Sequence, residues 1–237
     1  PAWAIFNGEK QHGITWHMIE GGIDEGDILS QTLFDIAEDE TALSLNSKCY
    51  AAAMDSFPSV VDQLETDLNR RPQDLGQRSY FAFSDRPEAG GHLSYTQTAE
   101  VLSAHVRGLD FGAYWNPLTT SKILISGQPV RVAQAQIMAS AYGSLPGTVV
   151  SNDPSGLRVA TGSNDLLLEG LTTLSGDTID FAALAPVGTR LAPISQDQAE
   201  QIAQQSARSL KGEPYWRKAL TAMASLPLPL ATLKQDG

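Results

Sequence analysis

Between His12 and Gln31 the chain places two short apolar runs on either side of a turn-rich acidic segment. The run Ile14-Thr15-Trp16-His17-Met18 has the composition of a strand, and alternate side chains of a strand point the same way. Thr15 and His17 are therefore expected on one face. The intervening segment holds Gly21, Gly22, Asp24, Glu25, Gly26 and Asp27, and Ile28-Leu29 opens the second run. The pattern predicts strands over about 13–20 and 27–36, joined by a tight loop.

Such a hairpin can bring His17 and Asp24 together, although they lie seven residues apart in the chain. An imidazole beside a carboxylate suits proton transfer, because each group influences the protonation and orientation of the other. An ordinary polar turn is the alternative on the pattern alone, since Gly and Asp are common in hairpin loops. His17 would then be a plain strand residue.

The opening segment PAWAIFNGEKQHGITWHMIEGGIDEGDIL resembles the second half of the catalytic domain of folate-dependent formyltransferases. The positions that match the family are Pro1, Ala4, Ile5, Gly8, Gly13, Ile14, Thr15, His17, Asp24, Gly26 and Leu29. The resemblance implies an α/β fold that begins with the C-terminal part of a Rossmann-like catalytic domain, over residues 1–75.

The resemblance also implies roles for the residues of this hairpin. Asp24 would be the catalytic carboxylate, with His17 and Thr15 as supporting polar neighbours. The loop that holds Ile23, Asp24, Glu25, Gly26 and Asp27 would border the pterin and formyl pocket. The formyl donor would be 10-formyltetrahydrofolate.

Members of that family carry an Asn-x-His pair upstream of this stretch, and its histidine stabilises the oxyanion. No Asn-x-His sequence occurs among these 237 residues. The chain is therefore expected to be a fragment of a longer protein that holds half an active site. Alone it should be inactive, and it should expose apolar surface where further strands would pack.

The middle of the chain is expected to be helical and then irregular. Apolar residues recur at helical spacing from Thr41 to Leu68, with Pro58 predicted to kink or split the helix near Phe57. The polar, turn-rich segment 69–77 is expected to connect two domains. Its Arg70 and Arg71 would be a solvated pair.

A second unit is expected over residues 76–192. A helix is predicted from Thr96 to Leu109 with Thr96 as its N-cap. Short strand-like runs follow, with turn residues between them, and they predict a small β-barrel. The runs are Lys122–Ser126, Pro129–Ile137, Gly147–Ser151, Gly156–Ala160 and Leu166–Leu171. The segment LPGTVVSNDPSGLRVATGSNDLLLEGLTTLSGDTIDFAAL resembles the OB-like C-terminal barrel of the same family.

The last segment, residues 193–237, changes character. It is rich in Gln and Ala up to Ala224, and a Leu-Pro stretch from Leu226 to Leu230 is expected to be extended. The piece GEPYWRKALTAMASLPLPL resembles the opening segment of catalytic domains in nonribosomal peptide synthetases. It would then be a helical linker towards a following synthetase domain. A terminal helix that folds back on the barrel is the alternative.

Composition excludes several classes of partner. The chain has 16 basic and 27 acidic residues, a net charge of −11, whereas nucleic-acid binding needs Lys and Arg to neutralise phosphates. A tRNA substrate is therefore disfavoured.

Cys49 is the one cysteine and the histidines lack ligand spacing, so no metal is expected. Neither a signal peptide nor a membrane-spanning run is evident, which favours a cytoplasmic location.

Three functions fit these observations. The first is formyl transfer to the amine of an aminoacyl substrate held on a carrier protein of a peptide synthetase. The second is a free-standing formyltransferase for the amine of a sugar or another small molecule. The third is an inactive formyltransferase-like module kept for interaction, since Asp24 alone cannot make the chemistry.

Overall fold

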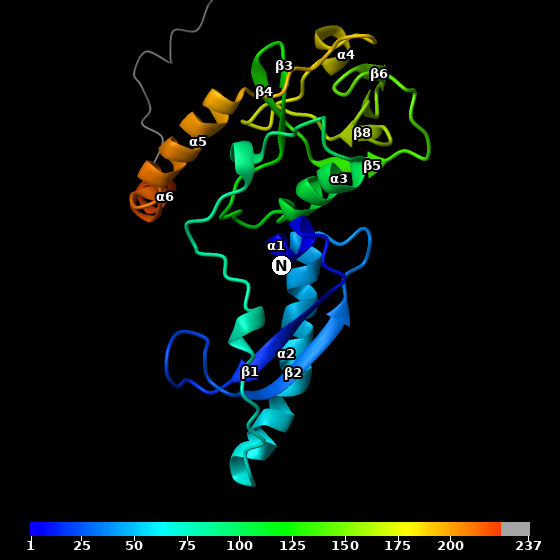
Figure 1. Ribbon diagram of the computed structural model, residues 1–237. Coiled ribbons are helices and arrows are strands. Elements are labelled where there is room, and N and C mark those ends of the chain that lie inside the picture. The colour runs from blue at the N-terminus through cyan, green and yellow to red at the C-terminus, as the bar shows by residue number, and fades with distance from the viewer. Residues whose placement is uncertain (224–237) are drawn as a thin grey trace, which may run out of the picture.

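The computed structural model describes residues 1–223, and the Leu-Pro stretch predicted to be extended lies outside them. Figure 1 shows a lower unit of one hairpin and a long helix, an upper unit of short strands and helices, and two helices beside the upper unit. We call the lower part the hairpin unit and the upper part the sheet unit. The predicted mixed α/β fold is confirmed.

The hairpin unit contains two helices and two antiparallel strands. They are α1 (Ala2–Phe6), β1 (Gln11–His17), β2 (Ile28–Asp35) and α2 (Ala42–Glu65). The strands are slightly shorter than the predicted ranges. A Cβ at Gly13 would collide with the backbone of Thr32 on β2, so the close approach of the strands requires glycine there.

The hairpin packs on α2 through Trp16. The Trp16 indole nitrogen donates to the Ser56 hydroxyl at 2.9 Å, and its ring lies 5.3 Å from that of Phe57. One face of β1 is thereby occupied by the helix. The β1–β2 pairing shifts register between Trp16 and His17, which is a bulge at the end of the strand that approaches the loop.

Helix α2 ends three residues before the predicted Leu68 and runs without a break. Thr41 and Ser44 form a reciprocal capping box at its start, which satisfies backbone donors of the first turn. Pro58 lies inside the helix, and the prediction that it splits the helix is wrong because α2 continues to Glu65. Pro58 and Met54 are both exposed, so water can reach the Met54 carbonyl that proline leaves without its usual helical donor.

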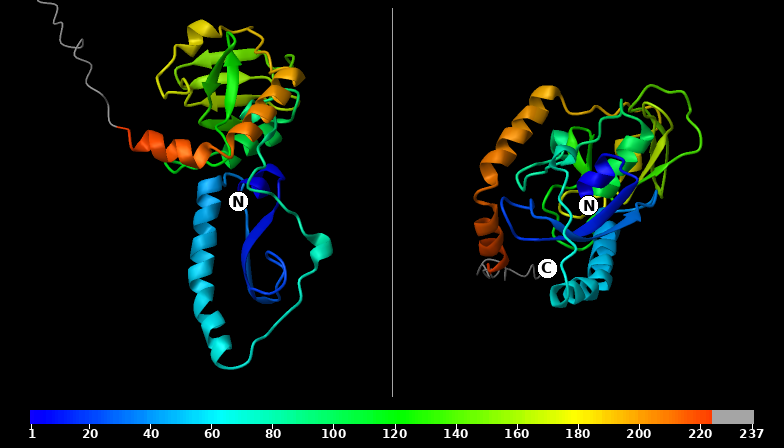
Figure 2. Two further views of the ribbon diagram at one scale, coloured as in Figure 1. Left: turned by 90° about the vertical axis from the view of Figure 1, so that its left-hand side faces the viewer. Right: turned by 60° about the horizontal axis from the view of Figure 1, so that its bottom comes forward.

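After α2 the chain returns along the hairpin through residues 66–98. Figure 2 shows the hairpin between α2 and this returning segment. The segment contains two short 3₁₀ turns, η1 (Leu75–Gln77) and η2 (Glu88–Gly91). Arg71 forms an isolated antiparallel bridge with Ile28, with backbone hydrogen bonds of 2.7 and 2.9 Å. The connection is thus attached to the hairpin.

The sheet unit opens with α3 (Ala99–Gly108), which begins two residues later than its predicted cap implied. Thr98, and not Thr96, caps the helix by accepting from the Val101 amide. The Ser163 hydroxyl accepts from the Ala99 amide at 2.9 Å. This long-range contact explains the shift, because a residue distant in sequence helps to fix the first turn.

Six strands follow in two antiparallel sheets. One is a hairpin of β3 and β4, and the other has the order β5-β8-β7-β6. The strands are β3 (Lys122–Ile125), β4 (Gln128–Arg131), β5 (Gln134–Ile137), β6 (Val149–Asp153), β7 (Gly156–Val159) and β8 (Leu166–Glu169). The single run predicted over 129–137 is therefore two strands. The chain crosses from one sheet to the other at this point. The Val132 amide donates to the carbonyl of Ser121, just before β3, whereas the Ala133 amide donates to the carbonyl of Glu169 on β8.

The strands and α3 enclose the main core. It is built from Leu, Ile and Val side chains of both sheets, and Leu102 and Val106 of α3 point into it. A smaller cluster of Ile5, Leu45 and Ala104 joins α1, α2 and α3 where the two units meet. A short helix α4 (Phe181–Leu184) follows the last strand and is capped by Asp180.

Two helices continue beyond the sheet unit, α5 (Gln196–Ser209) and α6 (Glu213–Thr221). Ser195 and Gln198 form a capping box at the start of α5. The Arg217 guanidinium lies 4.1 Å from the centre of the Trp115 ring, which ties α6 to the segment before β3. Within residues 1–223, no helix has the length and apolar character needed to cross a membrane.

Candidate active site

His17 and Asp24 come together at the start of the loop between β1 and β2. The His17 Nε2 and Asp24 Oδ1 atoms are 3.5 Å apart. The His17 side chain is 25% exposed, whereas that of Asp24 is 75% exposed. The structure thus brings this predicted pair into contact, with the carboxylate open to an incoming molecule.

The backbone at Asp24 has an uncommon conformation. Its φ is +56°, in the left-handed region that few residues other than glycine adopt, although Asp and Asn do so more readily than most. Gly26 follows, where a Cβ would collide with the carbonyl of Met18. The short turn that directs Asp24 towards His17 therefore depends on both residues.

The hydrogen bond at the other ring nitrogen determines how His17 can interact with Asp24. Nδ1 lies 2.8 Å from the Met18 carbonyl oxygen, which only accepts, so Nδ1 must carry a proton. In the neutral ring Nε2 then has a lone pair directed towards a carboxylate. A single shared proton, on either Nε2 or Oδ1, makes the contact attractive. The pair is suited to accepting and releasing one proton.

Thr15 does not contact His17. Its hydroxyl accepts instead from the Gln31 side chain on β2 at 3.1 Å. The bulge after Trp16 separates the two residues that simple alternation along a strand would place together. Sequence reasoning could not detect this bulge, because it arises from the pairing of the two strands.

The loop that carries Asp24 is fixed by the returning connection. The Gln73 side-chain amide donates to the carbonyl oxygens of Asp24 at 3.1 Å and Gly26 at 2.6 Å. Arg78 donates to the Ile23 carbonyl at 3.3 Å and pairs with Glu25 at 3.2 Å. Sequence analysis missed both Gln73 and Arg78, since nothing in a polar linker signals which loop it will contact.

Arg70 also binds this loop. It pairs with Glu20 and, at 3.2 Å, with Asp27. The Arg71 side chain donates to Gln31 at 3.1 Å. Arg70 and Arg71 are both exposed, as the predicted solvated pair would be, and both also bind the hairpin. Ile23 is 81% exposed, so its side chain is free to contact a ligand.

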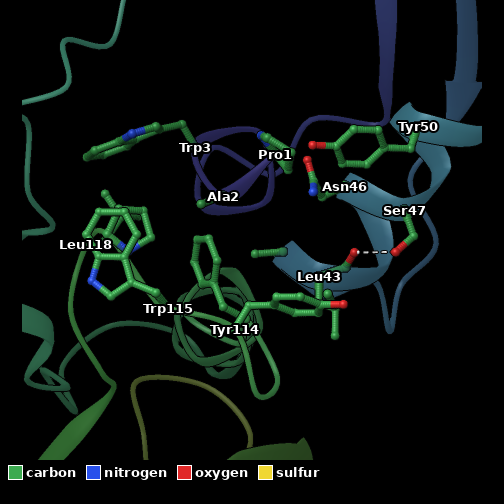
Figure 3. Close-up of a pocket in the computed structure, with 13 residues that line it drawn as sticks. Pro1, Ala2, Trp3, Leu43, Asn46, Ser47, Tyr50, Tyr114, Trp115 and Leu118 are labelled. Carbon is green, nitrogen blue, oxygen red and sulfur yellow. Dashed lines mark hydrogen bonds between the residues drawn. The ribbon is translucent and has the colours of Figure 1, made fainter. Parts of the chain in front are cut away.

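A cavity of about 530 Å³ lies elsewhere, at the junction of the two units. Figure 3 shows Trp3 of α1, Tyr50 of α2, and Tyr114 and Trp115 of the following segment around it. Residues of the loop between β1 and β2 do not line it. Trp3 also stacks on Phe81 at 4.8 Å between ring centres. The two tryptophans thus form part of a cavity wall near the core.

No group of three or more His, Cys, Asp or Glu side chains in residues 1–223 is arranged to hold a metal ion. Cys49 is half-buried in α2, and burial raises the pKa of its thiol. A raised pKa disfavours the thiolate, so Cys49 is poorly suited to act as a nucleophile.

Comparison with protein families assigns the class of protein. The model described as "Formyl transferase" matches residues 2–61, and the one described as "Formyl transferase, C-terminal domain" matches residues 87–186. The first match covers the hairpin and most of α2, and the second covers the sheet unit. The chain belongs to the formyltransferase family.

Two curated relatives are methionyl-tRNA formyltransferases. The one from Thiobacillus denitrificans is 30% identical over 194 residues, which is 79% of this chain and 60% of the relative. The one from Hydrogenovibrio crunogenus is 29% identical over 167 residues, 70% of this chain and 51% of the relative. The chain thus spans between about half and three fifths of the length of these relatives.

Solved structures share the fold. The N-formyltransferase of Helicobacter canadensis superposes with a TM-score of 0.53 at 18% identity, over 70% of this chain and 58% of that one. HypX of Aquifex aeolicus gives a TM-score of 0.52 at 19% identity, over 70% of this chain and 28% of that one.

Proposed function

We propose that the protein transfers the formyl group of 10-formyltetrahydrofolate to an amine. The observation that carries this proposal is the contact between His17 and the exposed Asp24, 3.5 Å apart, in a chain of the formyltransferase family. Folate as donor is supported by relatives of the same fold: the Helicobacter canadensis enzyme was solved with folinic acid, and HypX with tetrahydrofolic acid.

In this proposal the amine nitrogen attacks the formyl carbon, and the carbonyl oxygen takes up negative charge. Asp24 accepts a proton from the attacking nitrogen, while His17 shares that proton and holds the carboxylate in place. The bond between the formyl carbon and N10 then breaks. As the carbonyl re-forms, the leaving N10 takes the proton that Asp24 and His17 hold, and the products are the formamide and tetrahydrofolate. A positioned acid–base group of this kind contributes about 100- to 10,000-fold to the rate.

Supporting roles follow for the neighbouring residues. The loop Ile23, Asp24, Glu25, Gly26 and Asp27 would border the pterin ring. Two features of this loop support the role. The Ile23 side chain is exposed, and Gln73 holds the backbone carbonyls of Asp24 and Gly26 in place. Thr15, hydrogen-bonded to Gln31, would position a water or the acceptor and would not hold His17. Pre-organised groups of this kind avoid reorganisation during the reaction.

We further propose that β3–β4 and the four-stranded sheet act as one OB-like barrel. The Arg131 amide bonds to the Thr172 carbonyl at 2.8 Å, which links the hairpin to the chain after β8. Between Gly112 and Ala192 there are four basic residues, Lys122, Arg131, Arg158 and Arg190, and five acidic ones. A barrel with fewer basic than acidic residues is poorly suited to hold the phosphates of tRNA.

The acceptor we favour is an aminoacyl amine held on a carrier protein within a peptide synthetase. Its support is the acidic charge and the resemblance of the segment around Tyr215 and Trp216. The second candidate is a sugar amine. The Helicobacter canadensis relative, solved with dTDP-3-aminofucose, favours that reading. A third reading, an inactive interaction module, applies if the natural protein has no oxyanion donor.

The experiment supplies the full natural protein with 10-formyltetrahydrofolate and three acceptors in parallel. They are an aminoacyl thioester on a carrier protein, an amino sugar nucleotide and methionyl-tRNA, and mass spectrometry detects the formamide. Formylation of the carrier-bound amine is expected. Formylation of the sugar nucleotide alone would replace the favoured acceptor, and formylation of none would support the inactive module.

A further inference from the structure

A second cavity, of about 450 Å³, lies between α5 and the start of the sheet unit. Its walls come from the 3₁₀ turn η2, from the hairpin β3–β4 and from α5. We call it the α5 cavity. The matched family region ends at residue 186, so α5 lies outside that region. The left view of Figure 2 shows α5 against the sheet unit.

Helix α5 is seated firmly enough to form a wall. Gly90 has a φ of +59°, and a Cβ there would come within 2.5 Å of Ile202 on α5. The helix therefore packs directly on the backbone of η2. Gln198, Gln201 and Gln205 on the same helix line the cavity, which gives it amide donors and acceptors.

The ionisable side chains that line this cavity are all nitrogen bases. They are Arg86, His92 and Lys122, and no Asp or Glu is among the lining residues. The chain as a whole carries a net charge of −11, so a cavity with only basic groups is contrary to its overall balance. Positive groups held in a partly closed site attract anions more strongly than they do in open water.

Lys122 is the central cation. Its ammonium donates to the Thr119 hydroxyl and to the Thr120 carbonyl, both at 2.8 Å. An ammonium has three protons, so one donor remains. No carboxylate in residues 1–223 lies within ion-pair distance of it. Burial lowers the pKa of Lys122 to about 8, because no nearby negative charge stabilises the ammonium.

Arg86 and His92 add further hydrogen-bonding nitrogens to the cavity, and burial lowers the pKa of His92, which favours its neutral form. The Arg86 Nη2 atom is buried without a hydrogen-bond partner, although Arg86 forms an ion pair with Glu213 at 3.7 Å. Nδ1 of His92 donates to the Ala89 carbonyl at 2.8 Å, which leaves Nε2 as the remaining polar atom of the ring. Two donors in this cavity, on Lys122 and Arg86, therefore await an acceptor.

We propose that the α5 cavity binds a small organic molecule through a phosphate group. A phosphate supplies several acceptor oxygens for Lys122 and Arg86, and enough negative charge to neutralise Lys122. The apolar part of the molecule would lie against Leu118, Leu124 and Ile202, which also line the cavity. The volume is in the range of ordinary small-molecule sites. This site is separate from the loop of Asp24 and does not depend on formyl transfer.

Isothermal titration calorimetry of the full chain tests this proposal, with phenyl phosphate, inorganic phosphate and benzoate as probes. The titrations are run near pH 8, close to the pKa of Lys122, in two buffers of different ionisation enthalpy. His92 and His105 lie near Lys122 and have lowered pKa values, so they stay neutral at this pH. Phenyl phosphate should bind more tightly than the other probes and draw a proton from the buffer onto Lys122.

Lys122→Met should weaken phenyl phosphate binding by at least about tenfold and abolish the proton uptake, because a hydrogen-bonded charge is lost. Lys211→Met, at an exposed lysine after α5, is the matched control and should change neither. Arg86→Gln should also weaken binding, which keeps the test valid if Lys122→Met fails to fold. The proposal would be overturned if Lys122→Met and Arg86→Gln both bound phenyl phosphate as tightly as Lys211→Met does, or if the wild type did not bind it. Benzoate or inorganic phosphate binding as tightly as phenyl phosphate would overturn its choice of ligand.

Discussion

Asp24 occupies a backbone conformation that most side chains avoid, and the cost is offset by the contacts around it. A non-glycine residue in the left-handed region costs about 1 kcal/mol or more. Here the φ of +56° directs the carboxylate towards His17, and Gln73 holds the carbonyl of the same residue. Uncommon backbone geometry of this kind is concentrated at functional sites. The geometry of Asp24 therefore fits a residue kept for its chemistry.

Lys122 affects stability in the alkaline range. Its pKa is about 8 in the folded protein and 10.5 in an ordinary lysine, because burial disfavours the ammonium. Between these values the unfolded chain binds a proton that the folded chain has released, so stability rises with pH. We expect wild type to gain up to about 3 kcal/mol relative to Lys122→Met from pH 8 to pH 10.5. Urea denaturation of both proteins across this range measures the difference.

Tyr95 also titrates at alkaline pH, and burial raises its pKa. It opposes the effect of Lys122 above its ordinary value of 10. Both proteins carry Tyr95, so its contribution cancels in the difference. A constant gap between wild type and Lys122→Met across the range would contradict the assigned cause.

At the scale of elements, the connection after α2 fixes the geometry of the loop that carries Asp24. Gln73 and Arg78 hold the carbonyls of Ile23, Asp24 and Gly26, and Arg71 pairs with the start of β2. The segment itself has little regular structure beyond the short turns η1 and η2. Its role is therefore to restrict the loop, which short strands alone would leave free to move.

Gln73→Leu should release this loop. Two hydrogen bonds to Asp24 and Gly26 are lost, so we expect formyl transfer by the natural protein to fall by about tenfold. The free energy of unfolding should change by less than about 1 kcal/mol, because loops of this kind open locally. Kinetics and urea denaturation measure the two quantities.

Gln77→Leu is the matched control for that experiment. The Gln77 amide bonds only to the Asp74 carboxylate in the same turn, at 2.8 Å. Its loss should leave transfer nearly unchanged. Equal rates in the two variants would show that the connection does not position the loop.

The hairpin, the helices and the strand runs could be predicted because each rests on local patterns. The contact of His17 with Asp24 could be predicted too, since a short loop leaves few alternatives. The bulge after Trp16, the change of sheet at Val132 and the docking of Gln73 could not. Each of these depends on a partner distant in sequence, and no local pattern encodes that partner. Helix α2 continues through Pro58 because that part of the helix is exposed to water, and local sequence does not encode this exposure either.

At the scale of the molecule, α1 and α3 join the two units. The Phe6 ring stacks on His105 of α3 with 5.5 Å between ring centres, and Ile5 is buried with Leu45 and Ala104. One surface of α2 stays apolar and open, with Tyr50, Met54, Phe57 and Leu64 exposed.

Gly108→Ala should weaken the junction of the two units. A Cβ at Gly108 would collide with the Phe6 ring, so α1 must shift away from α3. Overpacking of this kind costs about 1–3 kcal/mol. Gly212→Ala is the control, because its nearest new contact is an ordinary 3.5 Å to the Trp216 ring. Chemical denaturation should show a loss for Gly108→Ala alone, and equal stability of the two variants would contradict the packing described.

The most direct test of the central claim is the rate of formyl transfer by Asp24→Asn in the full natural protein. Asn tolerates the left-handed backbone of this position, so the fold should persist and only the proton acceptor is lost. Asp35→Asn, at the far end of β2, is the matched control. We expect Asp24→Asn to lower the single-turnover rate by about 100-fold or more while folate still binds. A rate equal to that of Asp35→Asn would contradict the role of Asp24.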